Sequence, residues 1–142
     1  MTANGIPASA FVASAACAPS TGNLVPLLHE IRHALTRWLE QGEEHVIDLR
    51  SIPLAPGEED RLLEQLATGE VQARLSVLGP SDIIETRYPG VWLITHYNEN
   101  ENIIGRFIEV CGVPGILKSQ LEDSRAGLER LENDLSNAET TA

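Results

Sequence analysis

The 142-residue chain is poor in cysteine and in basic residues, and it contains no long apolar run. Cys17 and Cys111 are too few for a disulfide framework, and neither has the Cys-x-x-Cys spacing of redox or zinc sites. No segment approaches the ~18 consecutive apolar residues of a membrane-spanning helix. A glycine-rich phosphate loop and a nucleophile elbow are also missing. We therefore expect no membrane insertion, no cofactor and a buried, inert Cys111.

The charge is one-sided, because 10 Lys and Arg residues stand against 21 Asp and Glu residues, a net charge of −11 at pH 7. Nucleic acids and anionic membranes are bound by clustered Lys and Arg side chains that neutralise phosphates, so neither is an expected partner. Two interpretations of the acidity stay open: it keeps the chain soluble, or it suits a basic protein partner.

At this length we expect a single domain with a core of its own. Residues 1–22 are rich in alanine and serine with interspersed glycine and proline, which predicts a flexible N-terminal tail. Ala13-Ser14-Ala15 resembles a signal-peptide cleavage site, but no Lys or Arg precedes it, so we expect a cytoplasmic protein. The predicted domain covers residues 23–137, and residues 138–142 form a polar tail.

The centre of the chain carries the periodicity of β-strands. Apolar and polar residues alternate over residues 71–77, the pattern of a half-buried strand. In a strand over residues 83–88, Ile83, Glu85 and Arg87 would lie on one face and Ile84, Thr86 and Tyr88 on the other. Residues 91–97 and 103–110 are rich in β-branched and aromatic residues, and the five polar residues between them suit a hairpin loop. With a further strand at 45–50, the pattern predicts an antiparallel sheet of about five strands between residues 45 and 110.

Helical periodicity precedes and follows this sheet, so we predict an α+β fold in which the first and last helices cover the sheet. The first helix, from about residue 23 to 41, is expected to bury one stripe: Leu24, Leu28, Ile31, Leu35 and Trp38. The last helix, from 118 to about 137, carries four leucines on one face: Leu121, Leu128, Leu131 and Leu135. This narrow leucine stripe has a second interpretation, a contact with a second copy of the chain.

Within the first helix, His29-Glu30-Ile31-Arg32-His33 matches the H-E-x-x-H spacing of zinc peptidases, in which two imidazoles bind zinc and the glutamate activates water. Both histidines lie nearly opposite the expected buried stripe, whereas a catalytic zinc needs a shaped cleft and a third ligand. Arg32 adds a cation beside the supposed metal. We expect a solvent-exposed pair without metal, and a zinc hydrolase is the weaker alternative.

Pro89-Gly90 favours a type II turn, whereas tight hairpins prefer the primed types, so a corner and a hairpin both stay open. A corner would bring four side chains together at a rim, in the mixture of charge and aromatic surface common in recognition sites: Glu85, Arg87, Tyr88 and Trp92.

Two further polar residues lie in the predicted strands. His96 is expected to be hydrogen-bonded by a neighbour, in preference to an acid-base role. Glu109 is expected to pair with Arg106, Arg87 or a helix terminus, because burial without a partner is costly.

A set of short motifs is spread over the second half of the chain: Gly79-Pro80-Ser81, Glu85-Thr86, Tyr88-Pro89-Gly90-Val91-Trp92, His96, Phe107-Ile108-Glu109-Val110, Val113-Pro114 and Ile116-Leu117. In the order and spacing of these motifs the chain resembles the HupH or HyaF family of hydrogenase expression/formation proteins, accessory proteins of nickel-iron hydrogenase assembly. The resemblance covers about residues 24–135. Family members are often about twice this length, so the chain resembles only their repeated or C-terminal unit.

The resemblance implies a non-catalytic assembly factor that holds an immature hydrogenase subunit by shape and charge. The implied client is the iron-sulfur small-subunit precursor, and other maturation factors are further implied partners. We expect the client surface at seven residues: Glu85, Thr86, Arg87, Tyr88, Pro89, Gly90 and Trp92. An alternative of another class is a general dimeric interaction module, a homodimer joined through the last helix.

Overall fold

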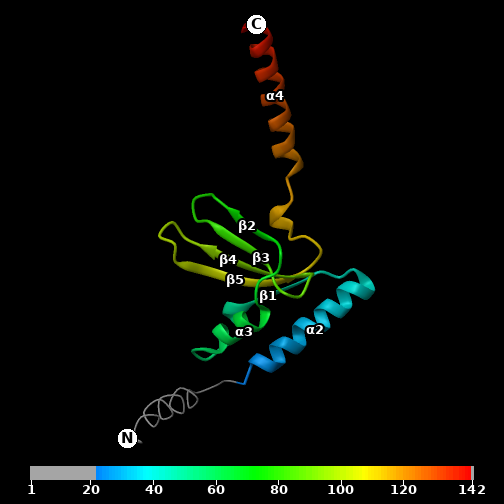
Figure 1. Ribbon diagram of the computed structural model, residues 1–142, viewed down its shortest axis with the longest axis vertical. Coiled ribbons are helices and arrows are strands. Elements are labelled where there is room, and N and C mark those ends of the chain that lie inside the picture. The colour runs from blue at the N-terminus through cyan, green and yellow to red at the C-terminus, as the bar shows by residue number, and fades with distance from the viewer. Residues whose placement is uncertain (1–21, 142) are drawn as a thin grey trace, which may run out of the picture. The chain divides into compact units, whose positions relative to one another are not determined.

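The structure is a computed structural model that describes residues 22–141 (Figure 1). It consists of two compact units that divide between Cys111 and Gly112. The first unit holds the sheet with α2 and α3, and the second holds η3 and α4. The predicted domain at 23–137 therefore spans two units, and the predicted N-terminal tail, apart from Gly22, lies outside the described residues. Over residues 22–141, no helix has both the length and the apolarity that crossing a membrane requires.

Five strands form one antiparallel sheet in the order β1-β5-β4-β3-β2, which confirms the predicted five-stranded sheet. The strands β2 to β5 are neighbours in sequence order, and β1 pairs with β5. The four-residue strands β1 and β2 therefore form the two edges. The bounds are His45–Asp48 for β1, Gln72–Leu75 for β2, Ser81–Glu85 for β3, Val91–Tyr97 for β4 and Ile103–Val110 for β5.

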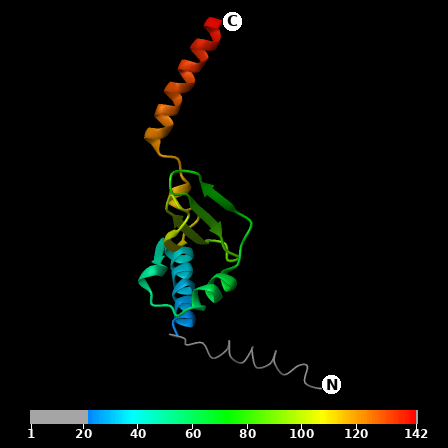
Figure 2. The same ribbon diagram turned by 90° about the vertical axis from the view of Figure 1, so that its left-hand side faces the viewer.

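The main core lies between one face of the sheet and the helices α2 (Leu24–Gln41) and α3 (Glu58–Leu66), which lie on the same side of the sheet (Figure 2). Ile108 of β5 is central to it, because it is the register partner of both Ile47 on β1 and Leu93 on β4. The buried residues of this core are Leu27, Ile31, Ala34, Ile47, Leu49, Leu62, Leu66, Val91, Ile108 and Val110.

The buried stripe of α2 is displaced from the expected one. Its centre is formed by Leu27, Ile31 and Ala34, spaced four and three residues apart on one helical face. Ala34 is fully buried, and its small side chain keeps the backbone of α2 close to its neighbours. The other residues of the expected stripe are only partly buried beside this centre: Leu24, Leu28, Leu35 and Trp38.

Two features fix the start of α3. Glu58, Glu59 and Asp60 occupy its first turn, where the helix dipole stabilises negative charge. The fully buried Glu58 carboxylate accepts a hydrogen bond from the Ala55 N–H at 2.9 Å, and the Glu58 N–H donates to the Ala55 carbonyl at 3.0 Å. The preceding 3-10 helix η2 (Leu49–Ser51) contributes the buried Leu49 to the core.

The second unit contains the short η3 (Gly115–Leu117) and the long α4 (Leu121–Thr141). The α+β class is confirmed, and within its own unit no residue of α4 is buried. The apolar positions of α4 form one narrow row among polar and charged residues. The predicted polar tail is helical through Thr141, and the Thr141 hydroxyl donates to the Asn137 carbonyl one turn earlier at 2.9 Å.

Candidate binding surface

The connection between β3 and β4, Thr86 to Gly90, is a tight hairpin loop, so the hairpin interpretation of Pro89-Gly90 is correct. The Val91 N–H donates to the Tyr88 carbonyl at 2.9 Å, and Gly90 has a φ of 92°, as a type II turn requires at this position. Thr86 closes the loop, because its N–H and its hydroxyl both donate to the Val91 carbonyl, at 2.9 and 2.8 Å.

The loop is held between the two core helices. The Arg87 N–H donates to the carbonyl of Leu66, the last residue of α3, at 2.8 Å. Gly90 lies against α2, where an added Cβ would stand 3.1 Å from the Trp38 ring and 3.4 Å from Leu35 Cδ1. The position of the turn is therefore set by packing on both sides, and its tip is left accessible.

The seven residues expected at a client surface fall into two groups. Arg87 and Pro89 are exposed, and Glu85 and Tyr88 are partly exposed. The remaining three are buried: Thr86, Gly90 and Trp92. Whether the accessible four bind a partner stays a prediction.

The expected exposure of the three buried residues is wrong for identifiable reasons. Thr86 is buried because it forms the hydrogen bonds that close the loop, and Gly90 is buried because it packs against α2. Trp92 is 4 % exposed, and its indole N–H donates to the Cys111 carbonyl at 3.2 Å. Because its neighbour Val91 is also buried, β4 is covered on both faces here, and alternation along the strand does not mark a solvent side. Cys111 itself is buried, as predicted.

The Tyr88 hydroxyl is hydrogen-bonded by two polar side chains at the tip of the turn. It accepts a hydrogen bond from Gln65 Nε2 and another from an Arg87 guanidinium nitrogen, both at 2.8 Å. The Arg87 guanidinium carbon lies 5.0 Å from the centre of the Tyr88 ring. The bond from Arg87, and then that from Gln65, lowers the pKa of Tyr88 below its ordinary value. With both acceptor positions used, the hydroxyl proton remains available to donate a hydrogen bond.

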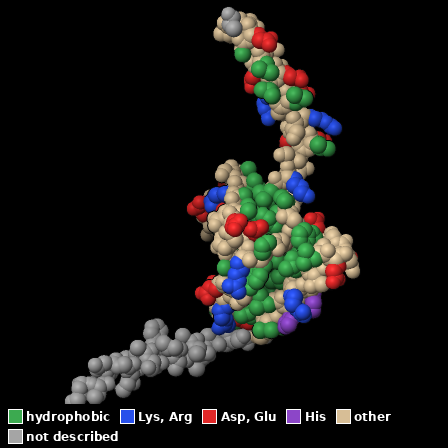
Figure 3. Space-filling model, turned by 45° about the vertical axis from the view of Figure 1, so that its right-hand side comes forward, with side chains coloured by type: hydrophobic (Ala, Val, Ile, Leu, Met, Phe, Trp, Pro, Cys, Tyr) green, Lys and Arg blue, Asp and Glu red, His purple; other side chains and the backbone are tan. Residues whose placement is uncertain are grey.

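Beside Tyr88, a mostly apolar groove of about 310 Å³ opens between α2, α3 and the hairpin loop; we call it the α2–α3 groove. On the face in Figure 3, apolar side chains form a continuous area bordered by charged and histidine side chains. The residues that line the α2–α3 groove are Leu28, Ile31, Arg32, Leu35, Gln65, Leu66, Tyr88 and Val91. Sequence reasoning found Arg32 and Tyr88 separately but missed the groove, because its walls come from three distant segments.

The H-E-x-x-H histidines are exposed, as predicted. An Arg32 guanidinium nitrogen lies 3.1 Å from His33 Nε2 and 3.4 Å from His29 Nδ1, so a cation already faces both imidazoles. In the described part of the chain, no group of three or more His, Cys, Asp or Glu side chains is arranged to hold a metal. This geometry gives no support to the zinc hydrolase alternative.

His96 has the neighbour that was expected, because its Nδ1 lies 2.6 Å from the Ser81 hydroxyl on the paired strand. Of the partners expected for Glu109, Arg106 is wrong, since Arg106 pairs instead with Glu59 at 3.2 Å and donates to the Thr95 hydroxyl at 3.2 Å. Burial raises the pKa of Glu109 above its ordinary value, and the charge of a nearby carboxylate adds to the shift.

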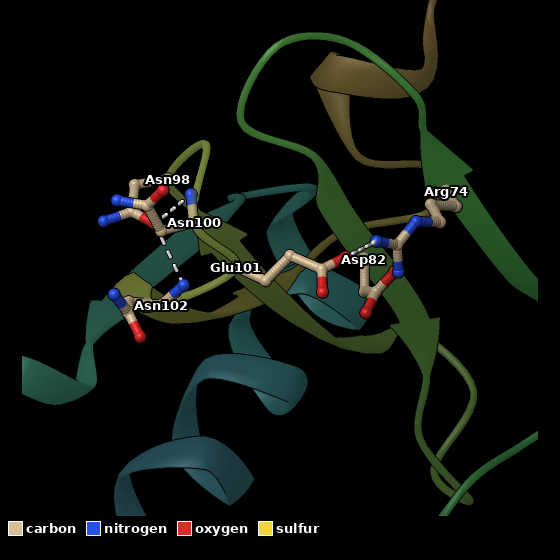
Figure 4. Close-up of polar contacts among 6 residues, drawn as sticks. All are labelled: Arg74, Asp82, Asn98, Asn100, Glu101 and Asn102. Carbon is tan, nitrogen blue, oxygen red and sulfur yellow. Dashed lines mark hydrogen bonds and ion pairs between the residues drawn. The ribbon is translucent and has the colours of Figure 1, made fainter.

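The loop between β4 and β5 has the predicted five residues (Figure 4). The Asn98 side-chain oxygen accepts from the N–H groups of Asn100 and Asn102, both at 2.9 Å. Nearby, Arg74 pairs with Asp82 at 3.0 Å and with Glu101 at 3.9 Å. Arginine charge is thus neutralised at this end of the sheet. Arg32 and Arg87, by contrast, form no ion pair with any residue from 22 to 141.

The fold and this surface define a small α+β protein with a mostly apolar groove beside a hairpin turn. The region described as "HupH hydrogenase expression protein, C-terminal conserved region" matches residues 22–138. The chain therefore belongs to the HupH family of hydrogenase expression proteins, which confirms the resemblance found in its motifs.

Individual relatives agree with this assignment. The solved structure of the hydrogenase expression protein HupH from Thiobacillus denitrificans has a TM-score of 0.79 and 39% sequence identity, covering 84% of this chain and 99% of that one. The hydrogenase expression/formation protein HupH of Rhizobium leguminosarum is 29% identical over 90% of this chain and 45% of its own length. The HoxQ protein of Azotobacter vinelandii is 30% identical over 77% and 39% respectively. The chain thus spans less than half the length of these two curated relatives.

Proposed function

We propose that this protein is a non-catalytic, cytoplasmic accessory factor in nickel-iron hydrogenase maturation, and that it holds the iron-sulfur small-subunit precursor together with other maturation factors. The observation that carries the proposal is the family match over residues 22–138. Relatives that share this region are named hydrogenase expression/formation proteins, a name that states a role in producing hydrogenase and no reaction of their own.

The proposed client surface is the α2–α3 groove together with the exposed side chains of the turn, Arg87, Tyr88 and Pro89. Its apolar lining gains stability when client side chains displace water from it, at roughly 25 cal/mol per Å² of apolar area. A client segment that fits is therefore amphipathic, with two or three apolar side chains facing α2 and α3.

Polar groups at the end of the groove set the orientation of the client segment. Tyr88 offers a hydroxyl proton, and Arg32 and Arg87 offer guanidinium groups that have no carboxylate partner among residues 22–141. A carboxylate or backbone carbonyl of the client matches these donors. The net charge of −11 acts at longer range and favours approach of a basic client surface.

The test is a pull-down from cells that produce the hydrogenase, with the full chain as bait. Leu28→Glu places a charge in the groove, and Leu39→Glu places the same charge on the same helix at a position that is 71% exposed. Wild type and Leu39→Glu should recover the small-subunit precursor, whereas Leu28→Glu should recover at least about tenfold less, as loss of a central contact predicts. Circular dichroism of both variants checks that each is folded.

A milder variant distinguishes loss of client binding at the groove from loss of folding stability. Tyr88→Phe removes only the hydroxyl, so reduced recovery with an unchanged unfolding curve supports the orienting role of Tyr88. If wild type recovers no hydrogenase component under assembly conditions, the maturation role is refuted. If Leu28→Glu and Tyr88→Phe recover the precursor as well as wild type does, the role stands and the groove is not the client surface.

A further inference from the structure

The helix α4 presents an apolar row that nothing in its own unit covers. It runs from Leu121 to Thr141 without a buried residue, a length of ~31 Å at 1.5 Å per residue. The exposed fractions of its four leucines, Leu121, Leu128, Leu131 and Leu135, are 75, 55, 55 and 55%. Uncovered leucines at regular spacing on a long helix are typical of a helix that packs against another helix.

The spacing of this row is that of a coiled coil. Leu121, Leu128 and Leu135 are seven residues apart and occupy the a positions of three successive heptads. The d positions, three residues further on, are Ser124, Leu131 and Ala138. The row therefore alternates between large and small side chains at its two ends and has two leucines at its centre.

We propose that α4 pairs with α4 of a second copy of the chain in an antiparallel coiled coil. In this arrangement a and d positions meet across the interface, so Leu128 of one copy lies against Leu131 of the other. Leu121 then meets Ala138, and Leu135 meets Ser124, which places a large side chain against a small one at each end. A parallel pair would instead stack Ser124 on Ser124 and Ala138 on Ala138, which leaves poorly filled layers.

The charges beside the row favour the same direction. In a parallel pair, Asp134 of one helix would lie beside Glu139 of the other, which is repulsive. In the antiparallel pair, Arg125 of each copy lies beside Glu132 of the other, which gives two ion pairs. Neither Arg125 nor Glu132 has an ion-pair partner among the residues that the structure describes. The second copy supplies the complementary charge.

This self-association does not depend on the proposed hydrogenase client. It uses a different unit of the chain from the α2–α3 groove. Three heptads form a short interface, so the dimer should be in concentration-dependent equilibrium with the monomer in the micromolar range, roughly where ΔG of association is −8 kcal/mol.

Sedimentation equilibrium of the purified full chain tests the dimer. We expect wild type to approach twice the monomer mass as its concentration rises, and Leu128→Glu/Leu131→Glu to stay monomeric at every concentration. Asn133→Glu adds a charge on the outer face of the same helix and should dimerise as wild type does. A wild type that stays monomeric at ~100 µM, about a hundredfold above the expected dissociation constant, overturns the proposal.

Charge exchange tests the ion pairs in the same assay. Arg125→Glu should weaken the dimer by about three- to tenfold, because both pairs become repulsive, and the double exchange Arg125→Glu/Glu132→Arg should restore it. A double exchange as weak as the single one would refute the proposed pairing.

Disulfide trapping decides the direction. In a Cys17→Ser background, the single variants Ser124→Cys and Leu135→Cys are oxidised separately and as a mixture. An antiparallel dimer should cross-link only in the mixture, since residue 124 of one copy faces residue 135 of the other. Cross-linking of Ser124→Cys with itself would show a parallel dimer and would overturn the proposed direction.

Discussion

Replacing Gly90 by alanine tests how the hairpin turn is held against α2. The left-handed φ of 92° costs an alanine about 1–2 kcal/mol. The added methyl group would also stand 3.1 Å from the Trp38 ring and 3.4 Å from Leu35 Cδ1, and such crowding costs about 1–2 kcal/mol more. We therefore expect Gly90→Ala to lower the free energy of unfolding by about 2–4 kcal/mol.

Gly42→Ala is the matched control, because Gly42 has a φ of 72° and no atom within 4 Å of an added Cβ. This variant should carry the conformational cost alone, about 1–2 kcal/mol. The assay is urea unfolding followed by tryptophan fluorescence, which reports only on the first unit, since both tryptophans, Trp38 and Trp92, belong to it. If Gly90→Ala is no more destabilising than Gly42→Ala, the packing of the turn on α2 has been misjudged.

Two further substitutions probe charged groups of the sheet. The pKa of Glu109 is raised in the folded protein, so wild type loses stability as pH rises from the ordinary carboxyl pKa to the raised one. Glu109→Gln should therefore raise the melting temperature at pH 7 but not below pH ~4, and equal gains at both pH values would contradict the assignment. Arg106→Ala should cost about 1–3 kcal/mol in urea unfolding, because the half-buried ion pair with Glu59 and the bond to Thr95 are lost together. Arg37→Ala, which breaks an exposed pair, should cost under about 0.5 kcal/mol, and similar losses for the two variants would refute the argument.

The sheet could be predicted from the sequence because its signals are local. β-branched residues and the flanking turn sequences determine where β4 and β5 begin and end, and the structure confirms both. The strand expected at residues 83–88 lies instead at Ser81–Glu85, because Thr86 to Gly90 form the hairpin loop. The sequence also predicted that His96 forms a hydrogen bond with a neighbouring side chain, because a strand histidine usually meets a side chain on the paired strand. It did not identify that neighbour as Ser81.

What sequence reasoning missed depends on contacts between distant segments. Trp92 was expected at a rim because a corner at Pro89-Gly90 would have brought it there, whereas the turn is a hairpin loop and β4 is buried on both faces beside it. Arg106 of β5 pairs with Glu59 in the first turn of α3, far earlier in the chain, and no local pattern links them. The α2–α3 groove likewise exists only once three segments meet.

The edges of the sheet have a consequence for how a client is selected. Each edge is a strand of only four residues, so a foreign strand laid along β1 or β2 finds few free backbone groups with which to pair. Binding by strand addition depends mainly on hydrogen bonds to the peptide backbone, which is the same in every protein. A protein without a long edge has to distinguish clients by their side chains. Discrimination should then be sensitive to single substitutions in the client, and unfolded chains in general should be poor competitors.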